Sequence, residues 1–143
     1  MTDSTKAARP EFRNIHVTQI VAYRLPLAGL VSILHRISGA SLFLLMPFVI
    51  WMFDTSVTSE TTFERFSALF NAGCPGLPAW LIKLVTVGLI WAYIHHFVAG
   101  LRHLWMDFTH RMDKDFGRQS AVVTLVVGLG LTLILALKLF GVY

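Results

Sequence analysis

Residues 121–140 read AVVTLVVGLGLTLILALKLF, an apolar run with no charged side chain before Lys138. A helix needs about 20 residues to cross the hydrocarbon core of a bilayer, so this run predicts a transmembrane helix over about 119–140. Two further apolar stretches, at about 25–53 and 79–106, are long enough to cross as well, although both contain polar residues. The sequence therefore predicts an all-α integral membrane protein with three transmembrane helices.

The composition of the 143-residue chain agrees with this prediction. Hydrophobic residues make up 55% of the chain and charged residues only 14%, whereas a typical soluble domain has about 25% charged residues. The single cysteine, Cys74, excludes a disulfide framework and a multi-cysteine iron–sulfur or zinc site on this chain alone. The net charge of +4 does not indicate nucleic-acid binding, because the basic residues cluster between the apolar runs.

The distribution of these basic residues predicts the orientation in the membrane. Loops that carry an excess of Lys and Arg stay on the cytoplasmic side. We expect a cytoplasmic N-terminal segment over 1–24, followed by a membrane anchor domain over 25–143 with a periplasmic C-terminus. The basic residues that set this orientation are Lys6, Arg9, Arg13 and Arg24 in the first segment and Arg111, Lys114 and Arg118 in the second loop.

The first loop, over 54–78, is acidic and falls on the periplasmic side in this topology. Its Asp54-Thr55-Ser56 could begin a short interfacial helix with an apolar stripe, and an ordered loop is the alternative. The stripe would consist of Phe63, Phe66, Leu69 and Phe70.

The first span contains an arginine well inside its apolar run. Placing arginine at the centre of a membrane helix costs about 2.5–3.5 kcal/mol, and such residues are usually functional. Ser32 lies one turn before Arg36 on the same helix face, and His35 lies beside that face. This cluster could bind a carboxylate or a quinone carbonyl. In the structural alternative, Arg36 extends to the interface while Ser32 and His35 hydrogen-bond to backbone carbonyls.

The second span contains three histidines on two neighbouring helical stripes. His96, Gly100 and His103 form one stripe, and the other consists of His95, Ala99 and Arg102. A buried imidazole can ligate haem iron, and Gly100 would leave space for a flat macrocycle. An interhelical hydrogen bond is the alternative for each histidine.

Arg36 and His96 are predicted to lie at the same depth. At about 1.5 Å per residue, Arg36 lies about 16 Å and His96 about 15 Å from the cytoplasmic ends of their spans. One anion, such as a haem propionate, could then contact both helices. These observations predict a polar cluster that could hold a haem, without identifying the ligand.

Two motifs together resemble the signatures of a known family. They are YRLP at 23–26 with SILHRISG at 32–39, and HFVAGLRH at 96–103 followed by Asp107. The chain thus resembles the succinate dehydrogenase cytochrome b556 subunit, the C subunit of the complex II membrane anchor, from about residue 9 to the end. The resemblance implies three transmembrane helices that pack against a D-type hydrophobic anchor subunit in a bacterial inner membrane.

The resemblance also implies a function and a set of site residues. The chain would form part of succinate:ubiquinone oxidoreductase, without dehydrogenase chemistry of its own, and electrons would come from the flavoprotein and iron–sulfur subunits. Haem b would be shared with the partner anchor subunit. His96 would be its axial ligand on this chain, with His95 or His103 as fallback. His35 and Arg36 would lie near the haem propionates, and Ser32 with Arg36 would line the ubiquinone site.

Three other functions fit the same spans. The chain could be a haem-free structural anchor, or a fumarate reductase-type anchor that uses menaquinone. It could also be a small transport or channel subunit, which would require further spans or oligomerisation to enclose a pore.

Overall fold

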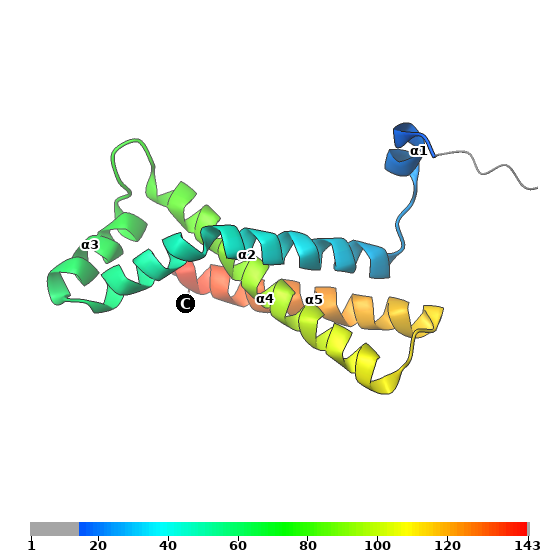
Figure 1. Cartoon of the computed structure of the whole chain (residues 1–143). Coiled ribbons are helices and arrows are strands. Elements are labelled where there is room, and N and C mark those ends of the chain that lie inside the picture. Colours follow the sequence, from blue (N-terminus) through cyan, green and yellow to red (C-terminus); the bar gives the residue numbers. More distant parts are fainter. Residues whose placement is uncertain (1–14, 143) are drawn as a thin grey trace, which may run out of the picture.

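The computed structural model describes residues 15–142, and every element within this range is an α-helix (Figure 1). A short helix, α1 (Val17–Ala22), precedes the long α2 (Leu27–Val57). The amphipathic α3 (Glu60–Asn71) follows, and then come α4 (Ala79–Thr109) and α5 (Lys114–Leu139). Lys6, Arg9 and Arg13, which contribute to the predicted orientation, lie outside the described residues.

Helices α2, α4 and α5 are the three predicted spans, and the all-α transmembrane fold is confirmed. They contain 31, 31 and 26 residues and are apolar enough to cross a membrane. At about 1.5 Å per residue, 31 residues extend well beyond a hydrocarbon core of about 30 Å. Each helix therefore projects past its apolar section, and α5 begins at Lys114 rather than near 119.

The two ends of this bundle carry different features. Figure 1 shows α1 and the α4–α5 turn at one end, and α3 with the C-terminal end of α5 at the other. This arrangement places the basic α4–α5 turn on the side opposite the acidic first loop. The cytoplasmic and periplasmic assignment of these ends stays a prediction.

The interfacial helix of the first loop begins later than the sequence suggests. Residues 54–57 continue α2, and α3 starts at Glu60 after Ser59, whose side chain accepts a hydrogen bond from the Thr62 amide. The Thr62 hydroxyl in turn accepts from the Ser59 amide at 3.0 Å. These reciprocal hydrogen bonds cap the N-terminus of α3, so that a new helix begins here after α2. Of the expected apolar stripe, Phe63 is exposed, whereas the others are half-buried: Phe66, Leu69 and Phe70.

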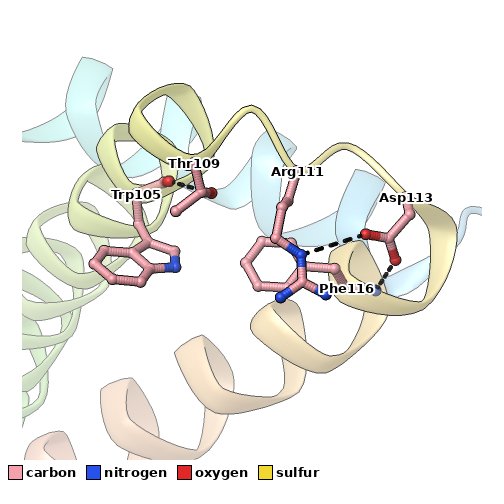
Figure 2. A network of polar contacts seen from close by, with 5 residues as sticks. All are labelled: Trp105, Thr109, Arg111, Asp113 and Phe116. Carbon is pink, nitrogen blue, oxygen red and sulfur yellow. Dashed lines mark hydrogen bonds and ion pairs between the residues drawn. The ribbon is translucent and has the colours of Figure 1, made fainter.

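The α4–α5 turn is held by local polar contacts (Figure 2). His110 ends α4 in the left-handed conformation, with a φ of 54°. Asp113 then caps α5, because its carboxylate accepts from the Phe116 amide at 2.8 Å. The Arg111 guanidinium lies 4.7 Å from the centre of the Phe116 ring, and its Nε lies 3.8 Å from Asp113 Oδ2. These contacts fix α5 antiparallel to α4.

Small side chains make up the interior of the bundle. Val31, Ala99 and Ala121 form a buried apolar cluster where α2, α4 and α5 meet. Small residues at such contacts let membrane helices approach closely. Most large apolar side chains instead point outward, toward lipid or another subunit. The close approach of α2 to α4 brings the polar residues of the two helices into contact.

Candidate functional site

Three half-buried histidines from α2 and α4 lie in contact. The His35 ring of α2 stacks on the His96 ring of α4, with 4.2 Å between ring centres and 13° between planes. The His103 ring lies 5.2 Å from His35 at a tilt of 43°. The stripe of His96, Gly100 and His103 therefore faces α2. Counting along the two spans predicted a similar depth for Arg36 and His96, and the contact of His35, the residue before Arg36, with His96 agrees with it.

Gly100 lies close to His35 of the neighbouring helix. A Cβ added at Gly100 would lie 3.7 Å from Nε2 of His35. This is an ordinary contact distance, and the space for a macrocycle beside Gly100 stays a prediction. Within residues 15–142, no group of three or more His, Cys, Asp or Glu side chains is arranged to hold a metal ion.

The His96 ring is oriented by a hydrogen bond across the helix pair. Its Nδ1 lies 3.0 Å from the carbonyl oxygen of His35. A carbonyl oxygen only accepts, so Nδ1 carries the proton and donates it. In the neutral imidazole, the lone pair is then on Nε2, the nitrogen left for a ligand. Histidines that bind metals commonly use one ring N–H in this way.

Two small residues of α2 complete the surroundings of this ring. The Ser38 hydroxyl donates to the same His35 carbonyl oxygen at 2.9 Å. A Cβ added at Gly39 would lie 2.6 Å from Cε1 and 3.0 Å from Nδ1 of His96. Only glycine lets α2 and the His96 ring approach so closely. Sequence reasoning had assigned no role to Ser38 or Gly39.

His96 lines an apolar groove between α2 and α4. The groove has a volume of about 440 Å³. A flat apolar group entering it would meet the half-buried His96 imidazole among aliphatic and aromatic side chains. The other lining residues are Gly39, Leu42, Phe43, Met46, Val49, Tyr93 and Phe97.

His95 faces the opposite way, into the interior of the bundle. Its side chain is only 1% exposed and stacks on Trp91, with 5.3 Å between ring centres. A Cβ added at Gly128 of α5 would lie 3.8 Å from its Nδ1. Its Nε2 is buried and has no hydrogen-bond partner among the described residues. The two adjacent histidines thus have different surroundings, and only His96 lies at a groove.

The predicted site residues of α2 differ in their surroundings and in their exposure. His35 faces α4, Ser32 is half-buried, and Arg36 is exposed. The structure therefore brings His35 together with His96 and His103, but leaves the Arg36 guanidinium on the outer surface. A charge in this position is open to a ligand or a partner chain.

Arg102 is a buried cation that sequence reasoning placed only on the His95 stripe. It is 8% exposed, and its Nε donates to Ser120 Oγ at 2.9 Å. Its guanidinium also donates to the Gly117 carbonyl at 3.3 Å. These bonds tie α4 to the first turns of α5. The seven-residue spacing from His95 to Arg102 was the signal that both residues share one face of α4.

Comparison with known proteins places the chain in a family. The model of the succinate dehydrogenase/fumarate reductase transmembrane subunit family matches residues 12–135. A succinate dehydrogenase cytochrome b556 subunit of Paracoccus denitrificans is 29% identical over the full length of both chains. Another of the same name, from Coxiella burnetii, is 30% identical over 87% of this chain and 90% of its own length. The transmembrane family, the three apolar helices and these bacterial relatives indicate a multi-pass protein of a bacterial inner membrane. The chain belongs to the succinate dehydrogenase/fumarate reductase transmembrane subunit family.

Proposed function

We propose that this chain is the cytochrome b membrane subunit of a succinate dehydrogenase, which holds haem b together with a partner anchor subunit and forms part of a ubiquinone reduction site. Its family and the names of its relatives support an enzyme complex of this kind. The observation that carries the haem assignment is the His96 imidazole, whose Nδ1 is bonded to the His35 carbonyl beside an apolar groove.

The residues around His96 suit a haem ligand. The bonded Nδ1 leaves Nε2 free to ligate iron, and Gly39 and apolar side chains line the groove. His95 suits this role less well because its side chain is only 1% exposed and does not line the groove. When bound, haem b would supply one-electron transfer. His35 and the exposed Arg36 are the polar groups of α2 that we assign to its propionates.

Ser32 and Arg36 are the residues that we assign to ubiquinone. Negative charge develops on the quinone carbonyl oxygens during reduction, and a positioned donor in a low-dielectric site stabilises it. Arg36 supplies a fixed positive charge and Ser32 a hydroxyl donor. They bind and polarise the substrate, whereas the electrons come from the flavoprotein and iron–sulfur subunits. The chain itself carries out no dehydrogenase step.

Two activities of the purified complex test this function. We expect Arg36→Ala to lower succinate-dependent ubiquinone reduction by about 100-fold, the typical cost of removing one preorganised donor. Succinate oxidation with an artificial acceptor should persist, because it bypasses the membrane subunit. Arg118→Ala is the matched control, since Arg118 is an exposed arginine of α5. Normal ubiquinone turnover in Arg36→Ala would contradict the assignment.

A further inference from the structure

Two donors from different helices share one backbone oxygen. The His35 carbonyl oxygen accepts from the Ser38 hydroxyl at 2.9 Å and from His96 Nδ1 at 3.0 Å. Ser38 is fully buried, so no water competes for its hydroxyl. A serine within a helix commonly donates to a carbonyl of the preceding turn. Here that carbonyl is also the acceptor for the imidazole of the neighbouring helix.

We propose that Ser38 is a positioning residue for His96, acting through the His35 carbonyl oxygen. The proposal rests on the proposed function, in which His96 ligates haem. A carbonyl oxygen offers two lone pairs, and the Ser38 hydroxyl occupies part of this capacity. The oxygen therefore accepts less strongly from Nδ1 of His96.

The strength of this bond affects the basicity of the ligand. A stronger acceptor at Nδ1–H makes the imidazole a more basic ligand. A more basic axial ligand favours the oxidised over the reduced form of a haem, so hydrogen bonding around the ligands tunes the potential. Ser38 weakens the acceptor and would therefore hold the potential of the haem higher than it would be without the hydroxyl.

The ring itself is confined independently of Ser38. Gly39 closes one side of the His96 imidazole, and the His35 ring stacks on it at 4.2 Å. Removal of the Ser38 hydroxyl should therefore leave the ring in position and change mainly the hydrogen bond. This separates an electronic effect on the haem from simple loss of the haem.

The test uses the intact complex, purified with wild-type Ser38 and with Ser38→Ala, Ser38→Cys and Ser38→Thr. Redox titration gives the haem midpoint potential, and electron paramagnetic resonance of the oxidised haem reports its ligand field. We expect Ser38→Ala to retain haem with a lower potential, Ser38→Cys to fall between Ala and wild type, and Ser38→Thr to restore the wild-type value. Ser41→Ala, a change of another α2 serine, should leave the potential unchanged.

An unchanged potential in a haem-loaded Ser38→Ala complex would overturn the role of Ser38 and leave the proposed function intact. Potentials that follow side-chain volume, with Ser38→Cys beyond wild type, would also overturn it, as would loss of haem in both Ser38→Ala and Ser38→Thr. Loss of haem in Ser38→Ala alone would overturn it too, because the ring is expected to stay in position without the hydroxyl. A wild-type complex without haem would instead overturn the proposed function, and Ser38 with it.

Discussion

Gly39 of α2 lies beside the His96 ring, and Gly39→Ala is the most direct steric perturbation of the site. The added Cβ would lie 2.6 Å from Cε1 of His96. This is about 0.9 Å short of the roughly 3.5 Å at which carbon atoms pack favourably. Either the ring or α2 must move, and the bond from Nδ1 to the His35 carbonyl, at 3.0 Å, changes with it.

The expected cost follows from this displacement. Extra volume in a packed interior typically costs about 1–3 kcal/mol. Since 1.4 kcal/mol is a factor of ten in an equilibrium constant, haem retention should weaken about 5- to 140-fold. This cost should mainly weaken haem binding, because the strained contact involves the proposed ligand itself.

Haem content per purified complex, measured optically, is the assay. Gly88→Ala and Gly130→Ala are matched controls, because a Cβ at either position meets nothing within 4 Å. Both controls should keep wild-type haem, and alanine should if anything favour their helices. Wild-type haem content in Gly39→Ala, with its absorption spectrum unchanged, would refute the steric reasoning and the position assigned to His96.

Two further predictions concern the bundle and its orientation. Arg102→Ala removes the hydrogen bonds to Ser120 and Gly117. Because hydrogen bonds to a charged group contribute about 1.5–3 kcal/mol each, the melting temperature of the complex should fall. An unchanged melting temperature would contradict the role of Arg102 in holding α4 to α5. Cys74, the single cysteine, lies in the first loop. A membrane-impermeant maleimide should label the chain in intact spheroplasts, and the Cys74→Ser variant should stay unlabelled. Labelling only in inverted vesicles would reverse the predicted topology.

The spans could be predicted from the sequence because hydropathy and length decide them. Their ends could not, because capping by individual polar residues decides where a helix starts. Asp113 starts α5 before the apolar run begins, and Ser59 starts α3 after α2 has continued past Asp54. Both caps lie in polar sequence where several residues could serve.

The site was predictable to the level of helical stripes. Counting along the spans predicted a similar depth for Arg36 and His96, and periodicity grouped His96 with His103. Periodicity could not show that the His95 stripe faces the interior while the His96 stripe faces α2. The roles of Ser38 and Gly39 depend on a contact with a residue far along the chain, and single-helix reasoning does not supply such contacts.

The most direct measurement of the central claim compares reduced-minus-oxidised optical spectra of the complex purified through a tag on this chain. Wild type, His96→Ala and His95→Ala are measured side by side. We expect a b-type haem signal in wild type and His95→Ala, and its loss or shift in His96→Ala. A signal that survives in His96→Ala but not in His95→Ala would move the ligand to His95. A wild-type complex with its partner subunits but without haem would contradict the account and leave a haem-free anchor.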